Sequence, residues 1–190
     1  MAWVQIGVWG DSLVHGGLDV EMGGWVHRMR CYLAGRGLGD HCFELGLGGQ
    51  NSADVLQRIG AELYFRQGYV DHVIVGVGIN DIHYAPKLTS PEEFRDNLAA
   101  LAEIVKAEKK TLHLLSLTPV RGAVDRAKWD ATNRTIREVA EDRRAHWIDV
   151  REAFDAADLV DDVHPDARGH EKLFETIKQA LMGSGVIPGE

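Results

Sequence analysis

The sequence is poor in the patterns that mark several classes of protein. It has only two cysteines, Cys31 and Cys42. Their spacing is not a CxxC pair and a disulfide framework needs more of them, so we expect reduced, partly buried thiols. No apolar run approaches the ~18 residues of a membrane span. The first residues have no basic region followed by a long apolar segment, so we expect no signal peptide. We therefore predict a cytoplasmic protein without a membrane span.

Clustered positive charge is also missing. The net charge is −8, and the acidic and basic residues are interspersed with no block of five basic residues. Nucleic-acid binding relies on clustered lysine and arginine, so we expect no nucleic-acid partner. The chain has no internal repeat, low-complexity tract or linker. Its 190 residues are the size of one domain with a full core, so residues 1–190 are predicted to form a single domain. The oligomeric state stays open.

Five short apolar runs alternate with segments of helical periodicity. The third run is dense in valine and isoleucine, as a strand buried on both faces should be. Ser90, Pro91 and Glu93 fit the N-cap, the first helical position and the capping-box partner of one helix. The predicted strands are 4–9, 42–47, 72–77, 111–117 and 146–150; the predicted helices are 25–33, 53–65, one that follows Ser90, 125–142 and 171–182. This alternation predicts a parallel sheet in a three-layer α/β/α sandwich.

Polar residues gather where the predicted strands end, and ligands of such sheets bind at the carboxyl ends of the strands. Asp11 and Ser12 follow the first strand. Residues 46–51 (GLGGQN) follow the second, residues 76–81 (GVGIND) follow the third, and residues 161–165 (DDVHP) come after the last. Each of these four clusters supplies a group that acyl transfer requires.

Ser12 is the candidate nucleophile, and a serine hydroxyl needs a base to take its proton at neutral pH. His164 is the candidate base. Asp161 lies three residues before it, a spacing that lets a carboxylate reach Nδ1 and stabilise the imidazolium. The backbone N–H groups of Ser12 and Gly49 and the side-chain amide of Asn80 are candidate oxyanion donors. Glycine at position 49 lets the backbone approach a substrate closely.

Every cluster also has an ordinary structural interpretation. Serine and aspartate before a helix are usually N-caps, and glycine pairs usually form tight turns. Asparagine and aspartate after a strand commonly cap or turn the chain. These interpretations apply to Asp11-Ser12, to Gly48-Gly49, to Asn80-Asp81, and to the acidic loop that holds Asp158, Asp161, Asp162 and His164.

Taken together, the four clusters resemble the blocks of the SGNH, or GDSL-type, hydrolase superfamily. The matches are Gly10-Asp11-Ser12-Leu13, Gly49 in a turn of small residues, Gly78-Ile79-Asn80-Asp81, and Asp161-Asp162-Val163-His164 with Pro165 and Gly169-His170 after it. The resemblance covers nearly the whole chain, and four blocks in the right order are specific. The second block is the least distinctive, because Gly48 competes with Gly49.

The resemblance implies a flavodoxin-like sheet of five parallel strands in the order 2-1-3-4-5. It implies Ser12 as the nucleophile, His164 as the base and Asp161 as its orienting acid. The implied oxyanion donors are Ser12, Gly49 and Asn80, and the implied supporting residues are Asp11, Gly78 and Asp81.

The implied activity is that of a lipase-like serine esterase or acylhydrolase, which cleaves a small-molecule ester through an acyl-enzyme without cofactor or metal. The short chain and modest loops favour small or short-acyl substrates. Candidate residues for shaping a substrate pocket are Trp25, His83, Tyr84, Pro86 and Val120. Lysophospholipase, thioesterase and carbohydrate O-acetyl esterase activities are alternatives, because fold and triad do not choose among them.

Two rival hypotheses lie outside this class. A metallohydrolase would use Asp161, His164, Asp166 and His170, which have ligand chemistry but lie on one segment only, whereas a catalytic metal wants at least three well-placed ligands. A non-catalytic α/β binding module would keep the fold and turn over no ester.

Overall fold

A parallel sheet of five strands runs through the centre of the protein in the computed structural model, which describes residues 3–37, 39–84 and 88–189. The strands are β1 (Gln5–Gly10), β2 (His41–Gly46), β3 (His72–Gly76), β4 (Thr111–Leu115) and β5 (His146–Ile148). Their order is β2-β1-β3-β4-β5, with every neighbouring pair parallel. The predicted order of the sheet is therefore confirmed.

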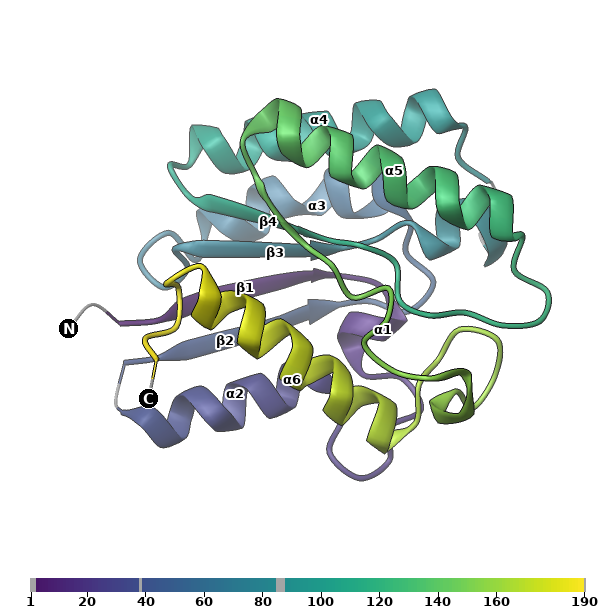
Figure 1. Cartoon of the computed structure of the whole chain (residues 1–190). Helices are drawn as coiled ribbons and strands as arrows, with labels where there is room; N and C mark the ends of the chain where they lie inside the picture. Colours follow the sequence, from purple (N-terminus) through teal and green to yellow (C-terminus); the bar gives the residue numbers. More distant parts are fainter. Residues whose placement is uncertain (1–2, 38, 85–87, 190) are drawn as a thin grey trace.

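Helices cover both faces of the sheet (Figure 1). One face carries α3 (Ser52–Tyr64), α4 (Pro91–Ala107) and α5 (Arg126–Arg143), and the other carries α2 (Trp25–Arg36) and α6 (Ala167–Gly183). Val73 and Val75 belong to the hydrophobic core on the α3–α5 side, whereas Ile74 belongs to the core on the α2–α6 side. The middle strand is thus buried on both faces, as its valine-rich sequence predicts.

Three short elements lie in the loops beyond β1, β3 and β5. They are α1 (Ser12–His15), the π-helical turn η1 (Asn80–Tyr84) and the 3-10 turn η2 (Ala156–Asp158). Helix α1 lies between the predicted strand 4–9 and the predicted helix 25–33, where the sequence predicted no regular element. Turns of π type are rare and often occur at functional sites.

Side-chain hydrogen bonds explain where the predicted element boundaries are wrong. Helix α6 begins at Ala167 rather than 171, because Asp166 caps it by accepting a hydrogen bond from the Gly169 N–H (2.8 Å). Strands β4 and β5 each end two residues before the end that the sequence predicted. The Ser116 hydroxyl accepts the Val150 N–H there (2.7 Å), so a side chain replaces the backbone ladder.

The start of α4 confirms part of its predicted cap. The Ser90 hydroxyl accepts a hydrogen bond from the Glu93 N–H (3.1 Å), and Pro91 is the first helical residue. Among the residues that the structure describes, however, the Glu93 side chain returns no bond to Ser90. The reciprocal capping box is found at α3 instead, between Asn51 and Asp54.

Three histidines form a row across β3, β4 and β5. His72 Nδ1 lies 3.3 Å from His113 Nε2, and the rings of His113 and His146 stack with centroids 4.8 Å apart. Burial, followed by the neighbouring histidines, lowers the pKa of His113 to about 3. Burial also lowers the pKa of His72. The fold therefore holds His113 as a neutral imidazole at physiological pH.

Both cysteines are free thiols, with Cys31 exposed and Cys42 buried. In the described part of the chain, no helix combines the length and the apolar character that crossing a bilayer requires.

Candidate active site

The turn that carries Ser12 follows β1 directly and is fixed by Asp11. The buried Asp11 is the N-cap of α1, because its Oδ1 atom accepts a hydrogen bond from the Leu13 N–H (2.9 Å). A side chain at Gly10 would lie 2.3 Å from the Gly76 carbonyl oxygen, so the strand must end in a small residue. The predicted N-cap thus exists beside the predicted nucleophile. Asp11 caps the helix, which leaves the partly exposed Ser12 to present its hydroxyl at the sheet edge.

Ser12, His164 and Asp161 form a continuous hydrogen-bonded relay. The Ser12 Oγ atom lies 2.8 Å from His164 Nε2, and His164 Nδ1 lies 2.8 Å from Asp161 Oδ2. The second carboxylate oxygen, Oδ1, accepts the backbone N–H groups of Val163 (2.9 Å) and His164 (2.8 Å). With Nδ1 donating to Asp161, Nε2 is the acceptor that faces the serine hydroxyl. This arrangement can accept a proton from Ser12.

Hydrogen bonds keep Asp161 ionised. Partial burial pushes its pKa up, but the bonds from the Val163 and His164 N–H groups and from the His164 ring outweigh burial, and the pKa is lowered overall. The other acids of this loop have different partners. Asp158 pairs with Arg168 and Lys172, and Asp162 faces Arg121. Asp161 alone among these three acids reaches His164.

Asn80 joins the loops that follow β1, β2 and β3. Its Nδ2 atom donates to the backbone oxygen of Gln50 (2.8 Å) and lies 3.5 Å from Asp11 Oδ2. Gly49, the residue before Gln50, is exposed and has a φ of +77°. Gly48, in contrast, does not have a positive φ. The structure therefore brings Asn80 beside the Ser12 turn and beside the turn of Gly49, as the sequence predicts.

Comparisons with known proteins agree with this geometry. The model of the GDSL-like Lipase/Acylhydrolase family matches residues 8–172. The chain belongs to this family. It is therefore a hydrolase that acts on ester bonds, and with a serine in the family motif it is a serine esterase.

Solved structures of hydrolases have the same fold as this GDSL-like protein. LAE5, an alpha/beta hydrolase from the metagenome of Lake Arreo, has a TM-score of 0.81 at 22% identity, covering 100% of this chain and 99% of its own. The acetyl xylan esterase AlAXEase has a TM-score of 0.81 at 19% identity, with 93% and 99% covered. Axe2, an acetylxylan esterase from Geobacillus stearothermophilus, has a TM-score of 0.78 at 21% identity, with 94% of each chain covered. No functionally curated protein matches the sequence significantly.

Gly78 and Asp81 hold the Asn80 turn of this GDSL-like hydrolase from both sides. Gly78 has a φ of +128°, and a Cβ atom there would lie 3.1 Å from the side chains of Leu117 and Thr132. Asp81 is buried and accepts hydrogen bonds from the Ser52 N–H (3.0 Å) and hydroxyl (2.6 Å). Burial raises the pKa of Asp81, although the Ser52 bonds oppose this. The Asp81 carboxylate thus anchors the turn to α3.

The Asp11 carboxyl is also electrostatically strained. Burial is the main cause, and the nearby Asp81 adds to it, so that the pKa of Asp11 rises to about 7 although the Leu13 N–H bond opposes the shift. Asp11 therefore changes its charge close to physiological pH while in contact with Asn80.

The loop after α1, for which the sequence predicted no role, packs against the relay of Ser12, His164 and Asp161. A Cβ atom at Gly17 would lie 3.6 Å from Ser12 Cβ and 3.7 Å from His164 Cδ2, so the loop after α1 is a wall of the site. The buried Asp19 fixes this loop, because it accepts hydrogen bonds from three backbone N–H groups and forms an ion pair with Arg28. Arg28 also donates to the Ala167 carbonyl (3.0 Å), which ties the loop to α6.

The predicted alternative metal set is not assembled. Asp161 and His164 bind each other, Asp166 caps α6, and His170 Nε2 lies 3.4 Å from the Gly17 carbonyl oxygen. In the parts of the chain that the structure describes, no group of three or more His, Cys, Asp or Glu side chains is arranged to hold a metal ion. The metallohydrolase hypothesis therefore has no site on these residues.

Two of the predicted pocket residues lie elsewhere. Trp25 is buried in the core between α2 and the sheet, where it lines only a small cavity of about 30 Å³ together with Asp11. Val120 is partly buried and packs against the core beneath α3, α4 and α5. His83 lies in η1. Pro86 and the Tyr84 side chain lie outside the described part of the structure.

Proposed function

We propose that Ser12 is the nucleophile, His164 the general base and Asp161 the orienting acid of this esterase, and that it cleaves small O-acyl esters. The unbroken relay of two 2.8 Å contacts from Ser12 through His164 to Asp161 supports this assignment. Its geometry meets the requirement for an activated serine, in which the base contacts the nucleophile and a third group orients the base.

In the proposed reaction, Ser12 Oγ attacks the ester carbonyl carbon while His164 Nε2 takes the hydroxyl proton. The Asp161 carboxylate stabilises the resulting imidazolium through Nδ1. His164 then donates the proton to the departing alcohol oxygen, which leaves an acyl-enzyme on Ser12. A water molecule attacks the acyl-enzyme, His164 accepts its proton, and the carboxylic acid is released as Ser12 regains its hydrogen.

The tetrahedral intermediates need donors for their oxyanion. We assign the backbone N–H groups of Ser12 and Gly49 and the Nδ2 amide of Asn80 to this role. Within the described chain, neither of the two backbone N–H groups donates to another protein group. Asn80 has a strong bond to Gln50 and a longer, 3.5 Å contact to Asp11. The hydrogen of the longer contact is the one that turns to the oxyanion, while the Gln50 bond fixes the amide plane.

For the substrate, we propose short acyl groups, with acetylated carbohydrates as the first class to test. The solved acetylxylan esterases that share the fold support this choice. Lysophospholipids and acyl thioesters are the alternatives. A series of p-nitrophenyl esters from acetate to octanoate, run beside acetylated xylo-oligosaccharides, tests it. Highest kcat/KM on acetyl groups supports the proposal, and highest kcat/KM on octanoate contradicts it.

The cytoplasmic location stays a prediction, which cell fractionation tests.

Labelling with a fluorophosphonate probe tests the nucleophile itself. We expect one adduct, located by mass spectrometry on Ser12, and none in Ser12→Ala. Ser116 provides an internal comparison, since it is buried with its hydroxyl bound to Val150 and Asp149. An adduct on Ser116, or no adduct at all, would contradict the assignment. A complete lack of turnover on every ester would favour the non-catalytic binding module.

A further inference from the structure

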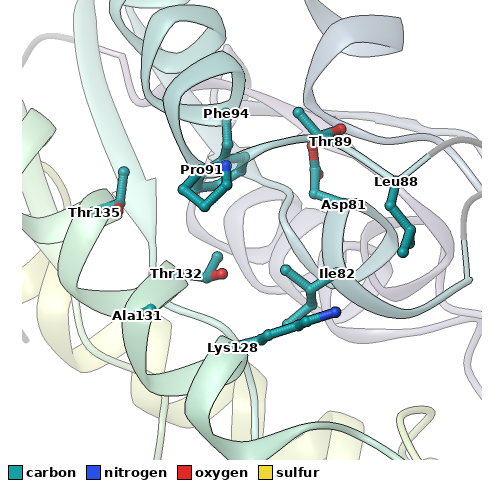
Figure 2. Close-up of a pocket in the computed structure, with 10 residues that line it drawn as sticks. All are labelled: Asp81, Ile82, Leu88, Thr89, Pro91, Phe94, Lys128, Ala131, Thr132 and Thr135. Atoms are coloured by element: carbon teal, nitrogen blue, oxygen red, sulfur yellow. The ribbon is translucent and has the colours of Figure 1, made fainter.

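A cavity of about 200 Å³ lies behind the Asn80 turn, between η1, the start of α4 and the first turns of α5 (Figure 2). Its walls are mainly apolar and come from Ile82, Leu88, Pro91 and Phe94. The carboxylate of Asp81 also borders it, but that group is bound to Ser52. An apolar cavity of about 150 Å³ in another protein holds benzene, so this one has room for a small alkyl or aryl group.

One buried hydroxyl points into this cavity without a protein partner. Thr132 is only 6% exposed, and Figure 2 shows its oxygen directed at the cavity interior. Within the described structure, this hydroxyl forms no hydrogen bond with protein. Among the described residues, the fully enclosed side-chain atoms without a partner are His113 Nδ1, Trp147 Nε1 and His170 Nδ1. The Thr132 oxygen is therefore accessible from the cavity, where a ligand or water can bond to it.

A cation stands at the edge of the same cavity. Lys128 precedes Thr132 by four residues on α5, so both side chains lie on one helix face. Figure 2 shows the Lys128 side chain extended alongside Ile82. Lys128 forms no ion pair with any side chain in the part of the protein that the structure describes. The cavity therefore combines apolar walls, a hydroxyl donor and an unneutralised ammonium group.

We propose that this cavity binds a small amphiphilic carboxylate, with a tail of about six carbons, as in hexanoate or benzoate. The tail packs against Ile82, Pro91 and Phe94. The carboxylate oxygens accept hydrogen bonds from Lys128 Nζ and Thr132 Oγ1, neither of which has a hydrogen-bond partner among the described residues. Ser12, His164 and Asp161 do not line this cavity, although Asp81, which anchors the Asn80 turn, does. Binding of the carboxylate there therefore does not depend on the proposed nucleophile.

Titration of the full-length protein with sodium hexanoate by isothermal calorimetry tests the proposal. Sodium acetate has the same charge without the tail, and hexanol has the tail without the charge. We expect saturable binding of hexanoate and at least about tenfold weaker binding of both controls, because each lacks one half of the recognition. Equal affinity for acetate and hexanoate would overturn the proposal. No ester is present in this experiment, so its outcome is independent of whether Ser12 is the nucleophile.

Substitutions on α5 then locate the bound carboxylate. Ala131→Phe fills the cavity, and Ala127→Phe is the matched control, since Ala127 is exposed on the same helix and does not line the cavity. We expect hexanoate binding to be lost in the first variant and kept in the second. Hexanoate bound at the Ser12 site would remain in both, which overturns the proposal.

Two milder variants keep the proposal testable if Ala131→Phe does not fold. Lys128→Gln and Thr132→Val each remove one donor while retaining most of the side-chain volume. We expect each to weaken hexanoate binding about tenfold, the typical cost of losing a hydrogen bond to a charged group. Unchanged affinity in both variants would show that the carboxylate binds elsewhere.

Discussion

The Nδ1 atom of His164 lies 2.8 Å from the Oδ2 atom of Asp161, while the other oxygen of the same carboxylate accepts the backbone N–H of His164. One side chain thus fixes both the ring and the backbone of the proposed base. The bonds lower the pKa of Asp161, so that it stays charged when the imidazolium forms.

Replacing Asp161 by asparagine tests the orienting role. An amide cannot stabilise the imidazolium and favours the wrong tautomer of His164, so kcat on p-nitrophenyl acetate should fall by on the order of 10⁴. Asp162→Asn is the matched control. Its acid faces Arg121 in a partly exposed ion pair, and kcat should stay within about twofold. Similar rates in the two variants would contradict the role of Asp161.

Removal of the Asn80 amide tests the proposed oxyanion donors. Asn80→Ala should lower kcat by about 10²–10³, the usual effect of losing one such donor, with KM little changed. Thermal denaturation of the variant checks that the fold survives the loss of the bond to Gln50. A folded variant with the wild-type kcat would remove Asn80 from the site.

The candidate site could be located in the sequence because its residues directly follow the strands. Ser12 and Asn80 come within a few residues of the ends of β1 and β3, and parallel strands place such residues at one edge. The alternation of apolar runs and helical periodicity was enough to predict the three-layer α/β/α architecture. The strand order came from the family resemblance, because periodicity alone does not specify which strands are neighbours.

Other features depend on contacts between distant segments, which no local pattern shows. The partners of the neighbouring acids Asp158 and Asp162 depend on where Arg121, Arg168 and Lys172 lie. The wall at Gly17 exists because Asp19 binds Arg28. The histidine row and the cavity behind Asn80 each join three or more elements. Such features become visible only after the chain has folded.

Glycine substitutions test which residue of the second block carries the special backbone. A Cβ atom meets nothing within 4 Å at either Gly48 or Gly49, but only Gly49 has a positive φ. Gly49→Ala should therefore cost about 1–2 kcal/mol of stability through backbone strain and reduce kcat. Gly48→Ala is the control and should lower neither. A loss of activity in Gly48→Ala alone would move the oxyanion role to Gly48.

The burial of His113, at the centre of the histidine row, should make the fold sensitive to acid. The pKa of His113 is about 3 in the folded protein against 6.5 in the unfolded chain. Between these values the unfolded chain binds more protons, so stability is full above pH 6.5 and is lost as the pH falls. The slope for one histidine is up to about 1.4 kcal/mol per pH unit. His113→Leu should flatten the pH dependence of urea unfolding between pH 4 and 6.5. An unchanged slope would contradict this role.

Asp11 should act on stability in the opposite direction. Its pKa is about 7 in the folded protein against 3.8 in the unfolded chain. The folded state therefore binds the extra proton, and stability falls as the pH rises from 3.8 to 7. Asp11→Asn keeps an N-cap acceptor for the Leu13 N–H but carries no charge.

We expect Asp11→Asn to be more stable than the wild type at pH 8, by roughly 4 kcal/mol at most, and similar to it near pH 4. Urea unfolding at both pH values measures this difference. The variant also tests whether the charge of the Asp11 side chain, rather than its shape, affects the proposed oxyanion donor Asn80. The neutral side chain leaves Asn80 without its carboxylate contact, so kcat above pH 7 should change while KM does not. Equal stability of the two proteins at pH 8 would mean that burial does not disfavour the charged form of Asp11.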